Sequence, residues 1–173
     1  MHPPPEWKNK AKHKANEILA EFAEVHTLTI PIPIRDVIES YVVDANVITS
    51  LDPIFADGIS GFARKEMDVG WVIALNGNEC PERQRFSAAH ELGHIVLMRS
   101  PRKIEYCSTD NTSWVERICD LFAGYLLMPE AHVRAYCRVS PRPYLEDIAK
   151  TFKVSRQVAE IQLKLLGLPF TKK

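Results

Sequence analysis

The chain has 173 residues, 46% of them hydrophobic, which is enough for one compact domain with a core and excludes a disordered chain. Lysine plus arginine and aspartate plus glutamate number 22 each, so the zero net charge argues against steering of the whole molecule toward nucleic acid or an anionic membrane. The sequence has no stretch approaching the roughly 18–20 apolar residues that span a bilayer and no apolar segment of a secretory signal, so we expect a cytoplasmic protein without a membrane partner.

The first half of the chain predicts two helices and a small sheet. Apolar residues recur at helical spacing from Glu6 to about His26, after the proline-rich residues 1–5. A short helix is expected from Ile34 to about Tyr41. Runs rich in β-branched and aromatic residues then predict three strands, at 42–48, 58–65 and 70–75. The last run, GWVIAL, is almost entirely apolar, so it is expected to be the central strand, ending in a turn at 76–78.

The second half is predicted to be helical. Pro81 suits the first position of a helix that runs to about Met98, and a second helix is expected from about Ser113 to the residue before Pro129. Two or three further helices are predicted, at about 130–138, 144–152 and 156–166. This order of a helix, a small sheet and then helices indicates the α+β class.

The four cysteines include no CxxC pair, which excludes a thioredoxin-like motif and a zinc ribbon. A chain of this length does not depend on disulfides for its stability. Cys80, Cys107, Cys119 and Cys137 are therefore expected to be reduced thiols, most of them buried.

The segment His90-Glu91-Leu92-Gly93-His94 fits the H-E-x-x-H pattern of zinc peptidases. Residues four apart share one face of a helix, so both imidazoles can point at one Zn²⁺ ion. Glu91 lies beside them, where its carboxylate can act as a general base on a water molecule at the ion. The alternative is a helix with two surface histidines, but the apolar residues around this segment predict a buried helix, in which paired histidines need partners.

Two histidines leave a catalytic zinc site one protein ligand short. The next predicted helix places Glu116 and Asp120 four residues apart, so Glu116 can supply the third ligand and Asp120 can accept the second N–H of a ligand histidine. The alternative for Glu116 is a capping box with Ser113, which would only close the helix start. Glu105 and Glu130 are poorer candidates for the third ligand, since Glu105 lies in an irregular link and Glu130 in a first helical turn.

Two linked segments, RFSAAHELGHIVLM at 85–98 and ERICDLFAGYLLMPE at 116–130, resemble the ImmA/IrrE family of metallopeptidases. This resemblance implies a zincin-like fold, with a small antiparallel three-stranded sheet, an N-terminal helix, the HExxH helix beneath the sheet and C-terminal helices. It also implies a zinc ion held by His90, His94 and Glu116, with Glu91 as the base. Asp120 stands where the family usually has asparagine, which adds a negative charge beside the ligands.

The resemblance further implies a protein substrate, a helix-turn-helix repressor whose cleavage releases a stress or mobile-element response. The oxyanion of the reaction needs a donor besides the zinc, and Tyr106, Tyr125, His132 and Tyr136 are the candidates. An edge strand near 58–65 could hold the substrate chain by β-augmentation.

The expected division is a metallopeptidase domain over 1–140 and a helix-turn-helix-like segment over 141–173 packed on it. Ser155 is a predicted N-cap, and the apolar stripe Val158, Ile161 and Leu165 is expected to be buried against the core or a partner. DNA binding is not expected, because Glu160 shares the solvent face and the chain is neutral. The rival hypothesis is a non-enzymatic, zinc-stabilised regulator that binds DNA or a partner protein through these helices.

Overall fold

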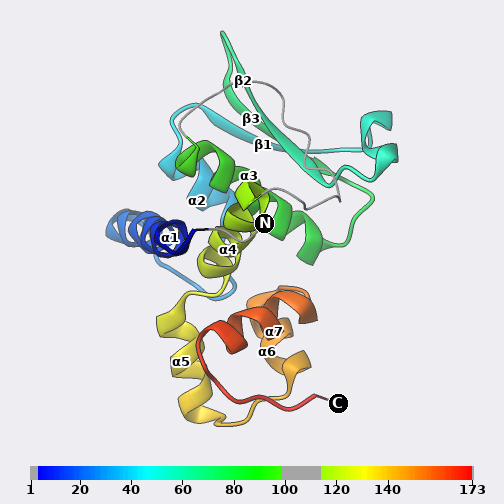
Figure 1. Cartoon of the computed structure of the whole chain (residues 1–173). Helices are drawn as coiled ribbons and strands as arrows, with labels where there is room; N and C mark the ends of the chain where they lie inside the picture. Colours follow the sequence, from blue (N-terminus) through cyan, green and yellow to red (C-terminus); the bar gives the residue numbers. More distant parts are fainter. Residues whose placement is uncertain (1–3, 99–113, 173) are drawn as a thin grey trace.

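A computed structural model describes residues 4–98 and 114–172 of the chain (Figure 1). The elements run in the order of a long helix, a short helix, a small sheet and five further helices, so the α+β class is confirmed. Their bounds are α1 Pro5–Val25, α2 Ile34–Tyr41, β1 Ala45–Ser50, a 3₁₀ turn η1 Pro53–Asp57, β2 Gly61–Glu66, β3 Gly70–Asn76, α3 Pro81–Leu97, α4 Trp114–Leu127, α5 Glu130–Val139, α6 Leu145–Phe152 and α7 Arg156–Leu165.

The three strands form a mixed sheet in the order β1-β3-β2. β3 is central, as predicted, and Asn76 closes the turn after it by accepting a hydrogen bond from the Asn78 N–H. β2 pairs antiparallel with β3, but β1 runs parallel to it, so the expectation of an antiparallel sheet is wrong for this pair. After β1 the chain forms β2 at the opposite edge and then returns between the two as β3. Because β3 is parallel to β1 and antiparallel to β2, the two outer strands run antiparallel to each other.

The first two strands begin about three residues later than predicted, and the backbone explains both shifts. Val42 still belongs to the end of α2 as its C-cap, and Asp44 then takes a left-handed φ of 58° before β1 starts. η1 was not predicted; Asp52 caps it by accepting a hydrogen bond from Ile54 N–H, and Gly58, with φ 79°, ends it. β2 therefore begins only after this turn.

The helices and the sheet are stacked in layers (Figure 1). α3 lies under the sheet against β2 and β3, α4 packs beneath α3, and α1 packs against α4. One continuous core joins these elements to the C-terminal helices, with fully buried side chains that include Ile18, Ile73, Leu92, Phe122 and Phe152. A small second cluster on the outer face of the sheet is centred on Phe55 and Phe62, whose rings stack with centroids 5.8 Å apart.

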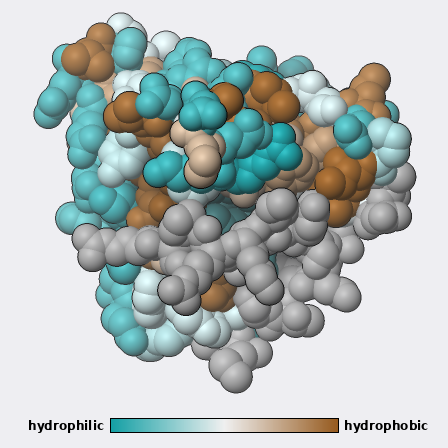
Figure 2. Space-filling model, turned by 90° about the horizontal axis from the view of Figure 1, so that it is seen from above, coloured by the Kyte–Doolittle hydropathy of each residue, from teal (hydrophilic) through white to brown (hydrophobic). Residues whose placement is uncertain are grey.

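The outer face of the sheet carries hydrophobic and hydrophilic residues side by side (Figure 2). Among the described residues seen from this side, the hydrophobic ones lie in separate patches. No helix in the described part of the chain has both the length and the apolar character needed to cross a bilayer.

The C-terminal helices make a tight pair joined at Lys153, which adopts a left-handed φ of 49° where glycine is usual. Ser155 caps α7 as predicted, accepting a hydrogen bond from Val158 N–H. Ile161 and Leu165 are 45% and 47% exposed, so the core does not bury these two residues, and their burial against a partner stays a prediction. α7 instead turns Ala159, Gln162 and Leu163 inward.

Gln162 is an unusual member of this inward face, because it is only 1% exposed and packs against Gly124 of α4. A methyl group added at Gly124 would overlap the Gln162 side-chain amide. The absence of a side chain at Gly124 is therefore what lets α7 sit close to α4.

We expect Gly124→Ala to destabilise the protein, although alanine alone would favour the helix by about 1 kcal/mol. Overpacking a buried contact typically costs about 1–3 kcal/mol, and the overlap here falls on an amide with no solvent space to enter. Chemical denaturation of Gly124→Ala, Gln162→Ala and the double variant measures the coupling. The double variant should lose less free energy of unfolding than the two single losses added together; simple additivity would contradict direct contact as the cause.

Candidate metal centre

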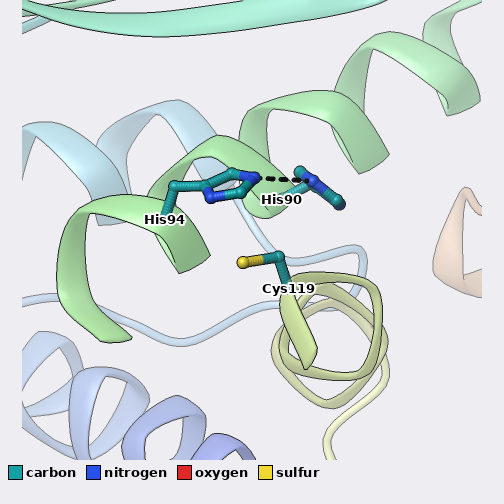
Figure 3. A group of neighbouring side chains, drawn as sticks. All are labelled: His90, His94 and Cys119. Atoms are coloured by element: carbon teal, nitrogen blue, oxygen red, sulfur yellow. Dashed lines mark hydrogen bonds between the residues drawn. The ribbon is translucent and has the colours of Figure 1, made fainter. Parts of the chain in front are cut away.

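Two histidines meet on the inner side of α3. His90 and His94 lie one helical turn apart, and their Nε2 atoms are 3.1 Å from each other (Figure 3). Both are shielded from solvent, with side-chain exposures of 4% and 12%. The helix therefore presents two imidazole nitrogens to one point, as the HELGH spacing predicted.

Glu116, in the first turn of α4, brings a carboxylate to the same point. Its two oxygens lie 3.1 Å from His90 Nε2 and 3.4 Å from His94 Nε2. Burial opposes its ionisation, but hydrogen bonds with the two histidines outweigh burial and hold the pKa of Glu116 well below its usual range. Ser113, the proposed partner in a capping box, lies outside the described residues, so the role of Glu116 as a ligand stays a prediction that its contact with His90 supports.

Asp120 lies one turn beyond Glu116 and contacts the other side of His90. Its carboxylate oxygen is 2.9 Å from His90 Nδ1, in the position expected from the sequence. A carboxylate at this distance accepts a hydrogen bond from Nδ1–H, and with a metal ion bound this contact would favour the tautomer in which Nε2 is the ligand.

Cys119 is the site residue that the sequence analysis did not single out. It follows Glu116 by three residues, and its sulfur lies within 4.8 Å of the histidine ligand nitrogens. Figure 3 shows the sulfur directed from α4 toward His94. Burial raises the pKa of this fully buried thiol, and His94 partly offsets the shift. The available signal was its place on the same helix face as Glu116, since residues three apart are neighbours on a helix.

Glu91, the neighbour of His90 on α3, reaches the backbone of β2 and is almost completely buried at 1% exposure. The backbone of Ala63 in β2 donates a hydrogen bond to its carboxylate, while Oε1 has no hydrogen-bond partner among the described residues. Burial raises the pKa of Glu91, against the opposing pull of His90 and His94. A buried carboxylate oxygen without a partner is costly, so this atom is held ready for a proton or a ligand.

The donor set fits a divalent metal ion. Nitrogen and oxygen donors at about 2.0–2.2 Å from a tetrahedral ion lie about 3.3–3.6 Å from one another. The separations among His90 Nε2, His94 Nε2 and the Glu116 oxygens are 3.1, 3.1 and 3.4 Å, close to this range. His90 and His94 also lie near enough to Cys119 for a second donor set of two nitrogens and a sulfur.

These donors come together because α3 and α4 approach closely at Gly93. A methyl group built on Gly93 would lie 3.1 Å from Phe122 Cδ1 and 3.3 Å from both Cα and Cβ of Cys119. Such distances are tighter than ordinary van der Waals contact, so a side chain here would move α4 outward. The glycine of HELGH thus controls the distance between the histidines and the carboxylate.

The remaining candidates from the sequence do not join this group among the described residues. Glu130 pairs with Lys12 and Arg134 on the surface, at 2.5 and 2.7 Å. Tyr125 interacts electrostatically with the same Lys12, and Tyr136 packs its ring on Phe152. His132 Nδ1 is buried without a partner in the described part of the chain. Tyr106, Glu105 and Cys107 lie outside the described residues, and Cys80, Cys119 and Cys137 are free thiols, of which Cys80 is exposed.

Comparison with known proteins shows the family to which this arrangement belongs. Residues 50–164 match a family model described as the IrrE N-terminal-like domain, Peptidase_M78. The radiation response metalloprotease IrrE of Deinococcus radiodurans is 33% identical over 119 residues, which are 59% of this chain and 36% of the relative. The same-named protein of Deinococcus deserti is 36% identical over 63 residues, 34% of this chain and 22% of the relative.

The chain therefore spans about one third or less of the length of these two relatives. Among solved structures, a Mycobacterium tuberculosis transcriptional regulator superposes with a TM-score of 0.61 at 14% identity, covering 94% of this chain and 47% of that one. At this identity the likeness concerns the fold alone.

We expect Gly93→Ala to weaken metal binding by at least about tenfold, because an outward shift of α4 separates Glu116 from the two histidines. Competition with a chromophoric chelator measures the affinity. Gly124→Ala is the matched control, since it perturbs the same helix on the side of α7 and leaves the donors in place. Equal affinities in both variants and in the wild type would contradict a role for the Gly93 contact.

Proposed function

The chain belongs to the IrrE N-terminal-like peptidase family, and we propose that it is a zinc-dependent endopeptidase. His90, His94 and Glu116 hold the ion, and Glu91 is the general base. The observation that carries this proposal is the convergence of three donor side chains from two helices beside a buried carboxylate with a free oxygen. A structural zinc site would have no use for a buried base at this position.

The chemistry divides between the ion and the chain's own residues. When bound, zinc supplies a Lewis acid that polarises the peptide carbonyl and acidifies water. Glu91 takes the proton of the attacking water and passes it to the leaving amine. Burial raises the pKa of Glu91 above its usual range, which favours a group that must both accept and return a proton. Asp120 orients His90 through Nδ1.

β2 is suited to hold the substrate. It is an edge strand of the sheet, lies against α3 and bonds Glu91 through the backbone of Ala63. A peptide that adds to this edge in extended conformation would run past Glu91 with its scissile bond near the ion. The donor that assists the oxyanion remains one of Tyr106, Tyr125, His132 and Tyr136.

We propose a cytoplasmic role in a stress response, with a helix-turn-helix repressor as the substrate. The Deinococcus radiodurans relative is a radiation response metalloprotease, and this supports the stress connection. Incubating the zinc-loaded protein with the helix-turn-helix protein encoded beside it, followed by mass spectrometry of fragments, tests the substrate. Intact repressor after long incubation would remove this substrate from the proposal.

Glu91→Gln should keep the fold and the metal but lower cleavage at least about 100-fold, because an amide cannot accept a proton from water. Glu116→Ala is the comparison variant: it keeps Glu91 but should lose metal at limiting zinc. Metal content by elemental analysis and cleavage rates at saturating zinc distinguish the two. Cleavage by Glu91→Gln at the wild-type rate would exclude Glu91 as the base.

The rival function, DNA binding through α6 and α7, gains little support from the charges on these helices. Arg156 is paired with Glu146 at 2.7 Å, and Lys164 and Lys172 are both paired with Glu160, at 2.6 and 2.7 Å. Phosphate contacts would have to break these pairs, and DNA affinity depends on several free cations.

We therefore expect weak binding to DNA, without sequence preference and lost at physiological salt. A gel shift with genomic fragments at two salt concentrations measures it. Tight, sequence-selective binding that Arg156→Ala abolishes would favour the regulator hypothesis.

A further inference from the structure

Four potential metal donors, not three, lie together between α3 and α4. His90 and His94 come from α3, and Glu116 and Cys119 come from one face of α4. All four side chains are wholly or largely buried, and Cys119 has 0% exposure. The number of protein donors matters because zinc with four protein ligands forms a closed structural site, whereas a catalytic site keeps one position open.

The distances allow the sulfur to join the set. A tetrahedral ion with Zn–N near 2.0–2.1 Å and Zn–S near 2.3 Å places nitrogen and sulfur about 3.5–3.6 Å apart. The Cys119 sulfur and the histidine nitrogens all lie within 4.8 Å of one another. Cys119 is anchored in α4 opposite Gly93 of α3, so its backbone lies close to the helix that carries both histidines.

A second observation concerns the buried carboxylate beside these donors. Oε1 of Glu91, 1% exposed as a residue, has no hydrogen-bond partner among the described residues and interacts electrostatically with His90, His94 and Glu116. The simpler interpretation is that Cys119 is a small apolar residue filling the gap beside Gly93, and this accounts for its burial. It does not account for a sulfur directed toward His94 (Figure 3).

We propose that Cys119 is a fourth protein ligand that closes the metal site in a resting state. This inference rests on the proposed metal centre of His90, His94 and Glu116 and adds a regulation of it. The thiol proton is released to solvent as the sulfur binds the ion, and it is taken up again when the sulfur leaves. With Cys119 bound, no position is open for water or a peptide carbonyl; with Cys119 turned away, the three-donor site is open.

Cobalt(II) in place of zinc tests the proposal in the full chain, because its spectrum reports the donors without any substrate. Visible ligand-field bands indicate a four-coordinate ion, and a near-ultraviolet charge-transfer band appears only when a thiolate is bound. The wild type should show both. Cys119→Ala should keep the visible bands, lose the near-ultraviolet band and bind cobalt at least about tenfold more weakly.

Cys137→Ala is the matched control, since it removes another buried thiol outside the donor group and should keep the near-ultraviolet band. Azide then probes the open position: it should shift the visible bands of Cys119→Ala and leave those of the wild type unchanged. X-ray absorption of the zinc-loaded wild type needs no variant, and should contain a sulfur shell near ~2.3 Å.

The spectra distinguish a failure of the fourth ligand from a failure of the metal centre itself. One outcome is that cobalt gives visible bands that depend on His90, while the thiolate band and the sulfur shell are both missing. This outcome overturns the role of Cys119 and leaves the three-donor site in place. An azide shift in the wild type equal to that in Cys119→Ala overturns the closed state. A wild type that binds no cobalt overturns the metal centre and, with it, this inference.

Discussion

The approach of α3 and α4 at Gly93 is the contact on which the site depends. Each helix alone carries an incomplete set: two histidines and a glutamate on α3, two carboxylates and a thiol on α4. A methyl group on Gly93 would lie only 3.3 Å from the Cα of Cys119, so the absence of a side chain there permits this close approach. The packing of Phe122 and Leu92 in the core holds this spacing, so the stability of the fold and the geometry of the donors share one interface.

That interface gathers an unusual amount of negative charge for a buried place. Glu91, Glu116 and Asp120 surround two imidazoles, and a carboxylate removed from water is unfavourable unless a charge or several donors compensate it. The histidine contacts stabilise the ionised form of Glu116, whereas Glu91 has one backbone donor and an unpaired oxygen. A divalent cation bound between the two helices would compensate this charge.

Much of this arrangement could be predicted from the sequence, and the misses have physical causes. Helical periodicity and proline positions located the helices to within one or two residues, because those signals are local. The HELGH spacing and the carboxylates four apart on the next helix identified His90, His94, Glu116 and Asp120 for the same reason. The contacts of these residues agree with that analysis, while their roles remain proposals.

Features that depend on the three-dimensional packing of the chain could not be predicted from local sequence patterns. The parallel pairing of β1 with β3 follows from where β2 lies, and no local pattern encodes that crossing. Cys119 carries no motif of its own; only the packing of α4 against α3 brings its sulfur to the histidines. The exposure of Ile161 and Leu165 has the same kind of cause. An apolar stripe predicts which residues share one face of a helix, but it does not predict which surface covers that face.

The contact between the N-terminal helix and α4 has a consequence of a different kind. Trp7 and Trp114 lie with their ring centroids 5.2 Å apart and their planes inclined at 59°. Trp114 opens α4, two residues before Glu116, so any change in how the first turn of that helix is seated alters the surroundings of both indoles. The two rings give the protein an intrinsic optical reporter: the colour and intensity of its tryptophan emission should follow the occupancy of the centre in real time, with no label attached.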